Sequence, residues 1–330
     1  MELSYFLYQS KYTDTINRFK EQSYSGALFK LTNKQDISGY SAYHALDSFG
    51  DMTVHTFVDN LKNNKLSSRH QLILQYLQQD LQDRQLKMDT LAGAFQLENH
   101  FLITDFEFAH DEFLQKIRDE KFNRVKLKMG KDLDRETKWI ESKLSFFKKN
   151  QIQLRLDFNE LFSFEEFDTW LKHTGFHKEG VIDFYEDPCV YDKTWWKKWK
   201  IQGLRLARDC YELEDQEQHE GVQVFVLKPS RINVIEWLKK LDNPQNYEYV
   251  ITHYLDSPLG VAQAAASALK MKFFVGNRLL NCGLLMNHSI PSLEWNISNR
   301  GPHILFRDDI GLGFSKELGE LNWSPLDYKF

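Results

Sequence analysis

The sequence predicts an α/β protein in which a barrel of parallel strands and helices is joined to a smaller α+β unit. Three observations predict this fold class. From about residue 100 onward, strand-like apolar runs alternate with helix-like runs, which is typical of a parallel sheet. The alternation repeats about eight times at intervals of roughly 20–30 residues, as a (β/α) barrel requires. The chain of 330 residues is long enough for such a barrel and one smaller domain.

Residues 1–98 are expected to form the separate α+β unit. Its predicted strands are Glu2–Gln9 and Gly26–Leu31, and its predicted helices are Val54–Leu61 and Gln71–Leu86. An apolar stripe supports the second helix, and it consists of Leu72, Leu74, Tyr76, Leu77 and Leu81. Ser10–Ser25 is polar with little apolar periodicity and reads as a loop, and Gly39–Asp51 is predicted to be a second loop.

Residues 99–300 are expected to form the barrel, and the tail 301–330, which lacks the alternation, is expected to pack back on the first unit. The predicted strands are Phe101–Asp105, Arg124–Gly130, Gln153–Asn159, Val181–Asp187, Gly203–Asp209, Val222–Pro229, Tyr247–Tyr254 and Lys272–Gly276. The predicted helices between them are Asp111–Lys121, Arg135–Lys149, Phe164–His173, Lys193–Lys200, Ile232–Leu241 and Pro258–Lys270.

Composition excludes several classes of protein. The net charge of −5 argues against general nucleic-acid binding. The most apolar long segment, Gly260–Gly276, contains Lys270 and Lys272, so no membrane span is expected. The N-terminus has no basic region followed by an apolar one, and three widely spaced cysteines suggest no disulfide framework. We therefore expect a cytoplasmic protein.

The segment Arg124–Gly130 carries two lysines on one face of a buried strand. Alternate strand residues face the same way, so Lys126 and Lys128 lie together, opposite Val125 and Leu127. Two neighbouring ammonium groups among apolar residues are costly unless an anion or a metal site lies opposite, or one lysine is neutral.

The following strands end in charged or polar residues, and the carboxylates among them could fill this role. These residues are Arg155, Asp157, Asn159, Glu186, Asp187, Asp209 and Lys228. In a (β/α) barrel the carboxyl ends of the strands meet at one mouth, so three carboxylates from consecutive strands converge there. A hard divalent cation would relieve their repulsion, and oxygen ligands favour Mg²⁺. A single such residue could equally begin a solvated loop, but the whole series favours an active site.

The series KLK, LRLDFN, YEDPC, ARD and VLKP resembles the enolase superfamily, and most of all its o-succinylbenzoate synthase branch. The segment HYLDSPLGVAQAAASAL at 253–269 and the tail segment DDIGLGF at 308–314 are similar to further family motifs. The resemblance implies a modified (β/α)₇β TIM-type barrel with an α+β capping domain. It also implies Mg²⁺, with Mn²⁺ as a substitute, and a small-molecule carboxylate as substrate.

The resemblance assigns roles to individual residues. It implies that Lys128 is the acid/base and that Lys228 is the catalytic lysine on the opposite face. It gives Asp157, Glu186 and Asp209 as metal ligands. Residues expected to contact the substrate or support the site are Lys126, Arg155, Asn159, Thr252, His253 and Gly283.

The implied reaction is a lyase reaction of menaquinone biosynthesis. It is the syn dehydration of 2-succinyl-6-hydroxy-2,4-cyclohexadiene-1-carboxylate to o-succinylbenzoate through an enediolate. Other reactions on the same scaffold stay open, namely racemisation or epimerisation of N-acylamino acids or dipeptides, and muconate cycloisomerisation. The sequence departs from the family at Cys210–Tyr211 and at Thr252–Tyr254, where substrate contacts cannot be transferred. The oligomeric state stays open, and a monomer is compatible with the sequence.

Overall fold

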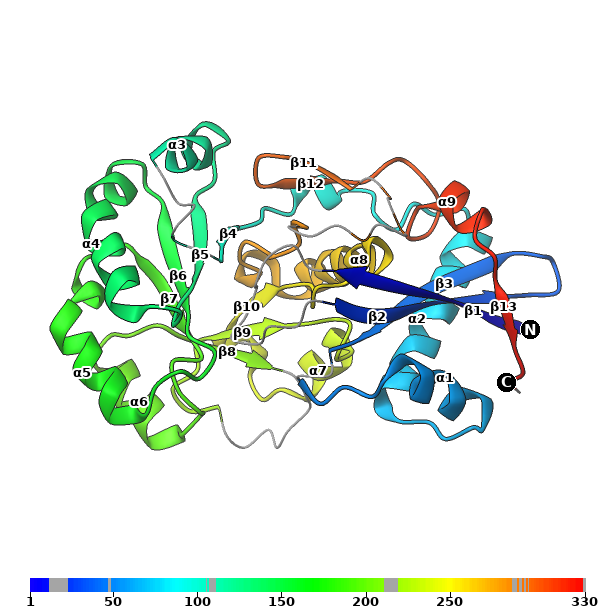
Figure 1. The fold of residues 1–330 in the computed structure, drawn as a ribbon, viewed down its shortest axis with the longest axis horizontal. Helices are drawn as coiled ribbons and strands as arrows, with labels where there is room; N and C mark the ends of the chain where they lie inside the picture. Colours follow the sequence, from blue (N-terminus) through cyan, green and yellow to red (C-terminus); the bar gives the residue numbers. More distant parts are fainter. Residues whose placement is uncertain are drawn as a thin grey trace.

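The computed structural model contains two parts side by side, a sheet-and-helix cap and a β/α barrel (Figure 1). The structure describes residues 1–328 except 12–22, 47–48, 105, 107–110, 211–218, 287–289, 291–292, 294 and 296. Most of the predicted loop Ser10–Ser25 therefore lies outside the described residues. No helix in the described part of the chain is long and apolar enough to cross a membrane.

The cap is a four-stranded antiparallel sheet in the order β13-β1-β2-β3, covered by two helices. Its elements are β1 (Glu2–Lys11), β2 (Ser23–Thr32), β3 (Ser38–Ala45), β13 (Ser324–Leu326), α1 (Val54–Lys62) and α2 (Ser68–Gln85). The prediction of a loop over Gly39–Asp51 is wrong for its first half, which is β3. Nearly every residue of β3 is buried, so it lacks the alternation that marks a half-exposed strand.

Glycine at position 39 lets β3 lie directly on α2. A Cβ atom there would stand 2.3 Å from the Leu77 carbonyl oxygen and 2.3 Å from the Leu81 nitrogen, which are backbone atoms and cannot swing aside. The glycine that suggested a loop therefore marks a close approach of strand and helix.

The tail of the chain returns to the cap. β13 pairs with β1 in antiparallel register, with Leu326 opposite Leu3. The Arg84 side chain donates to the Gly313 carbonyl oxygen at 2.7 Å, and Asp80 accepts from the Leu312 nitrogen at 2.7 Å. The short helix α9 (Ser315–Gly319) follows. The domain boundaries at residues 98 and 300 themselves stay predictions.

The barrel is built on a seven-stranded parallel sheet in the order β10-β9-β8-β7-β6-β5-β4. Its strands are β4 (Phe101–Ile103), β5 (Arg124–Lys128), β6 (Gln153–Asp157), β7 (Ile182–Glu186), β8 (Leu206–Cys210), β9 (Val224–Leu227) and β10 (Glu248–Ile251). Its helices are α3 (Asp111–Asp119), α4 (Leu133–Lys149), α5 (Phe164–Thr174), α6 (Lys193–Ile201), α7 (Val234–Lys240) and α8 (Pro258–Val275). Figure 1 shows α3 to α6 along the outer side of β5 to β7. The predicted fold class, a modified TIM-type barrel with an α+β cap, is confirmed.

The predicted eighth strand, Lys272–Gly276, is wrong, because α8 continues to Val275. Extended residues further on close the barrel instead. Leu279 and Gly283 form parallel bridges to Tyr249 and Thr252 on the β10 side, and Cys282 bridges to Asn99 just before β4. Helix propensity across the apolar run in α8 outweighs the short Phe-Phe-Val motif that suggested a strand.

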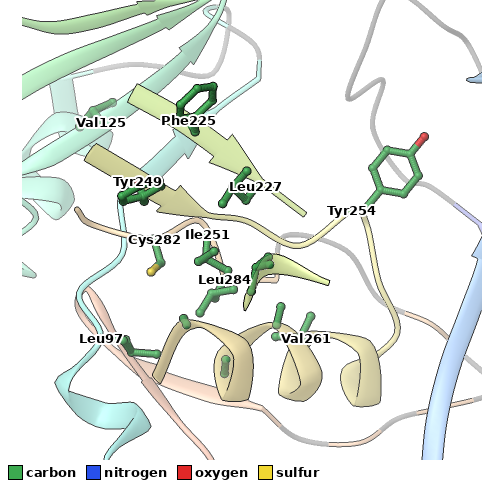
Figure 2. Packing of buried hydrophobic residues seen from close by; sticks show 14 of the residues in the cluster. Leu97, Val125, Phe225, Leu227, Tyr249, Ile251, Tyr254, Val261, Cys282 and Leu284 are labelled. Atoms are coloured by element: carbon green, nitrogen blue, oxygen red, sulfur yellow. The ribbon is translucent and has the colours of Figure 1, made fainter. Parts of the chain in front are cut away.

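The remaining elements are small. A two-stranded ribbon joins β11 (Ser298–Arg300) to β12 (His303–Leu305). Short 3₁₀ turns are η2 (Ala94–Gln96), η4 (Phe176–Lys178), η5 (Pro244–Asn246) and η6 (Gly276–Arg278). Buried side chains of β10 and of the segment that follows α8, among them Ile251, Cys282 and Leu284, lie between the strands and α8 (Figure 2).

Candidate active site

Strand register places the first three predicted charged residues in one row and Asp209 and Lys228 nearer the carboxyl ends of the next two strands. Lys128 lies opposite Asp157, and Asp157 lies opposite Glu186, so three neighbouring strands each place one charged residue in the same row. Asp209 on β8 lies opposite Val226, and Lys228 directly follows the last residue of β9. The carboxyl ends of five consecutive strands thus form a single charged mouth, as the alternation along each strand predicts.

Lysine ammonium groups and carboxylates are paired throughout this mouth. The Lys126 Nζ lies 2.7 Å from Asp157 Oδ2 and donates to Glu186 Oε1 at 2.7 Å and to Oε2 at 2.8 Å. The Lys128 Nζ donates to Asp157 Oδ2 at 2.5 Å and approaches the Asn159 Oδ1 at 3.4 Å. Lys126 therefore bridges two carboxylates, whereas Lys128, which is more exposed, holds one.

The pairing sets the protonation states of the two carboxylates. Burial opposes ionisation of Asp157, yet the Lys126 and Lys128 ammonium groups hold its pKa below the ordinary value. Burial and the charges of Asp157 and Asp209 raise the pKa of Glu186 to about 7, although Lys126 opposes this. Burial would lower the pKa of Lys126, but the charges of Asp157 and Glu186 prevail and raise it, so Lys126 stays charged.

A second ion pair occupies the other side of the mouth. The Lys228 Nζ donates to Asp209 Oδ2, and both side chains are largely buried. Burial lowers the pKa of Lys228, against the attraction of Asp209. Lys128 and Lys228 are thus held by different carboxylates on opposite parts of the strand row.

A divalent cation fits this site in its donor chemistry. Asp209 Oδ1 is buried and has no hydrogen-bond partner among the described residues, so one carboxylate oxygen is left for a further positive group. Asp157, Glu186 and Asp209 offer only oxygen donors, which suit Mg²⁺. In the arrangement observed, no three His, Cys, Asp or Glu side chains of the described residues are grouped as a metal site, because lysine ammonium groups lie between the carboxylates.

Arg155 lies one layer deeper in the barrel than the carboxylate row. It stands beside Lys126 in the register and is fully buried. Its guanidinium donates to Asp183 Oδ2 at 2.9 Å, to the Asn281 carbonyl oxygen at 2.6 Å, and contacts His100 Nδ1 at 3.0 Å. Arg155 therefore supports the site from below.

His100 and Asp183, which lie in this layer, are not among the residues predicted from the sequence. Burial and the positive charge of Arg155 hold the pKa of His100 well below its usual range, so its imidazole is neutral. Extending the predicted strand Phe101–Asp105 upstream by one residue would have placed His100 on the inner face, two positions before Leu102. Asp183 follows a register shift between β6 and β7, which no sequence pattern marks.

The remaining predicted site residues lie where β10 meets the closing segment. The His253 Nε2 lies 3.3 Å from the Leu285 carbonyl oxygen, and its Nδ1 accepts from the Asp256 nitrogen at 3.3 Å, so it orders two neighbouring loops. Thr252 Oγ1 is buried without a hydrogen-bond partner in the described part of the chain. At Gly283 a Cβ would stand 2.7 Å from His100 Cε1 and 2.9 Å from Thr252 Cγ2, so a glycine is required for packing. The predicted substrate contacts of these three residues stay predictions.

The cap and the barrel together give this chain a fold that solved structures share. No family model matches the chain. A curated o-succinylbenzoate synthase from Bdellovibrio bacteriovorus is 24% identical over 331 aligned positions, covering 99% of both chains. This relative carries the name of the branch that the sequence motifs resemble.

The solved structures that share this fold include a racemase and a dipeptide epimerase. The N-succinyl Arg/Lys racemase from Bacillus cereus matches with a TM-score of 0.73 and 14% identity, over 95% of each chain. A dipeptide epimerase from Enterococcus faecalis, solved with Mg and a dipeptide, matches with a TM-score of 0.70 and 15% identity, over 94% of this chain and 98% of that one. At such identities these structures establish the fold alone.

Proposed function

We propose that this chain is an o-succinylbenzoate synthase, which dehydrates 2-succinyl-6-hydroxy-2,4-cyclohexadiene-1-carboxylate to o-succinylbenzoate in menaquinone biosynthesis. The observation that carries the proposal is the pair of lysines, Lys128 and Lys228, held on opposite parts of a row of three carboxylates. The full-length similarity to a curated synthase of that name supports it.

Lys128 is the base in this proposal. It holds a single carboxylate and is more exposed than Lys126, so its ammonium can exchange with the substrate and the solvent. A neutral Lys128 removes the proton from the carbon that bears the substrate carboxylate. The same amine, now protonated, gives its proton to the departing hydroxide on the neighbouring carbon, so that water leaves and the ring becomes aromatic.

The other residues of the mouth hold charge. Lys126 stays ionised between Asp157 and Glu186, so it fixes a positive charge beside Lys128 on that side of the mouth. Lys228 keeps an ammonium on the opposite face, where negative charge spreads over the substrate. A divalent ion held by Asp157, Glu186 and Asp209 would supply electrostatic stabilisation of the substrate carboxylate during proton removal.

Direct assay of aromatisation tests the proposal. Lys128→Ala is expected to lower the rate by about 10²–10⁴-fold, the usual contribution of a general base. Lys149→Ala, which removes an exposed lysine at the end of α4, serves as the matched control and is expected to leave the rate unchanged. If Lys126→Ala abolished proton removal while Lys128→Ala spared it, the two roles would be reversed.

Racemisation or epimerisation of an acylated amino acid or dipeptide is the second candidate function. Two lysines on opposite sides of the carboxylate row favour it, because racemisation needs a base on each face, and racemases share this fold. Both reactions begin with removal of the α-proton, so the products formed from the cyclohexadiene carboxylate and from an N-succinylamino acid distinguish the two. Inversion of an N-succinylamino acid without aromatisation of the cyclohexadiene would assign the racemase and overturn the synthase.

A further inference from the structure

Tyr254 lies between the barrel and the cap, in the loop that joins β10 to α8. Figure 2 shows its ring directed away from Ile251 and Leu227. The side chain is only 5% exposed, so its surroundings are protein on most sides. The sequence at this place departs from the enolase-superfamily pattern, which leaves the role of this tyrosine open.

On the barrel side, the ring of Tyr254 faces two cations. The Lys228 Nζ lies 5.5 Å from the ring centroid, and the guanidinium carbon of Arg231 lies 3.9 Å from it. The Arg231 Nη2 also donates to the Tyr254 hydroxyl. Both distances are within the range of a cation–π contact, which is stronger when the cation is desolvated, as Lys228 is here.

On the cap side, the same ring is held by two aromatic residues. The His44 ring from β3 stacks on it at 5.3 Å between centroids, and Phe49 meets it edge-on at 5.7 Å. Asp256 fixes the geometry from both directions, since its Oδ2 accepts from the Tyr254 nitrogen at 2.8 Å and its Oδ1 lies 3.1 Å from the His44 Nδ1. The position of the ring therefore depends on the docked cap.

We propose that Tyr254 is the positioning residue of Lys228, and that its ring makes the orientation of that lysine depend on the docked cap. The inference rests on the proposed function in assigning Lys228 a part in the reaction. Asp209 binds the Lys228 ammonium at one point, and the ring offers it a second, uncharged face. An ammonium held from two directions has one orientation, whereas a flexible lysine held by one carboxylate has several.

Two variants of Tyr254 separate the ring from its hydroxyl. Tyr254→Phe keeps the ring and loses the bond from Arg231, and it is expected to retain kcat within about threefold. Tyr254→Leu removes the ring and is expected to lower kcat at least tenfold with KM changed less than threefold, because the lysine is misdirected after the substrate has bound. Equal losses in the two variants would overturn the proposal, since the hydroxyl would then be the essential group.

Tyr249→Leu is the matched control. Tyr249 is a buried tyrosine of β10, the strand that precedes the Tyr254 loop. Its hydroxyl donates to the Pro244 carbonyl oxygen, and its ring packs against Phe225 and Trp237. It is expected to lower stability without a selective loss of kcat. If it lowered kcat as much as Tyr254→Leu, the effect of Tyr254 would be structural only, and the proposal would fail.

A double-mutant cycle tests the contact without any activity. Tyr254→Leu and Lys228→Met are combined, and the equilibrium constants of unfolding are measured in urea. The effects are expected to be non-additive by at least about threefold. Additive effects would show that Tyr254 and Lys228 do not stabilise each other and would overturn the proposal, whatever reaction the wild type performs. A wild type without aromatising activity but with a non-additive cycle would instead reject only the proposed function.

Discussion

Glu186 shows how a single residue in the mouth depends on its neighbours. It is buried between Lys126, which favours its charged form, and two carboxylates, which disfavour it. Asp157, in the same row, is paired with two lysine ammonium groups, and its pKa is lowered. Two adjacent carboxylates therefore differ in protonation because the number of ammonium groups on each differs.

The shift at Glu186 predicts a change of stability with pH. Burial raises its pKa from 4.5 to about 7 in the folded protein, so the folded state binds more protons than the unfolded state between these values. The stability contributed by the protonated form is present at low pH and is lost as pH rises through about 7. Glu186→Gln is expected to gain up to about 3 kcal/mol relative to wild type between pH 4.5 and 7.5.

Wild type must be compared with Glu186→Gln because buried histidines change the stability of the folded protein with pH in the opposite direction. Burial lowers the pKa of His100 and of His253, so their contribution to stability rises with pH over the same window. Urea unfolding of both proteins across the pH range, without added metal, isolates the contribution of Glu186. A difference that does not change with pH would contradict the assigned shift.

At the same scale, the sequence predicts the charged mouth well. Charged residues at the ends of apolar strands stand out against strand propensity, and a period of two assigns their face. His100 and Asp183 were not found in this way, although the alternation reaches His100 when its strand is extended upstream by one residue. One precedes its strand and the other follows a register shift, and neither has a partner at a recognisable spacing.

Among the elements, the helices are predicted to within a few residues, and the errors have physical causes. β3 is buried on both faces because it packs on α2 and against the barrel, so its sequence does not alternate. The closing segment 279–283 is a set of single bridges to β10 and to the residues before β4, too short to produce a pattern. Both errors concern contacts between parts of the chain that are distant in sequence, and local propensity cannot predict such contacts.

The closing segment makes a prediction at this scale. Gly283→Ala would place a methyl group 2.7 Å from His100 Cε1 and 2.9 Å from Thr252 Cγ2, so the segment must shift from its bridges. A loss of about 1–3 kcal/mol in unfolding free energy is expected, as for other overpacked cores. Gly319→Ala in α9 is the control, because nothing lies within 4 Å of its added Cβ. Equal effects on urea unfolding would show that the closing segment adapts freely.

For the whole molecule, the three candidate ligands join elements that are far apart in the sequence. Asp157, Glu186 and Asp209 come from β6, β7 and β8, and their lysine partners come from β5 and β9. The lysines now neutralise these carboxylates, so a divalent ion must compete with ammonium groups for them. Binding of an ion would tie the three strands β6, β7 and β8 together and would stabilise the folded state only.

Mg²⁺ is therefore expected to raise the thermal unfolding temperature of the wild type. At a concentration of about 100 times its Kd the gain is about 2.7 kcal/mol, or roughly 4–8 °C. Asp209→Asn should abolish the shift, since the buried Asp209 Oδ1 has no hydrogen-bond partner among the residues that the structure describes. Asp119→Asn, which changes an exposed carboxylate at the end of α3, should retain it. A shift that survives in Asp209→Asn and is reversed by EDTA would place the ion elsewhere, and no shift in the wild type would mean that lysines alone balance the carboxylates.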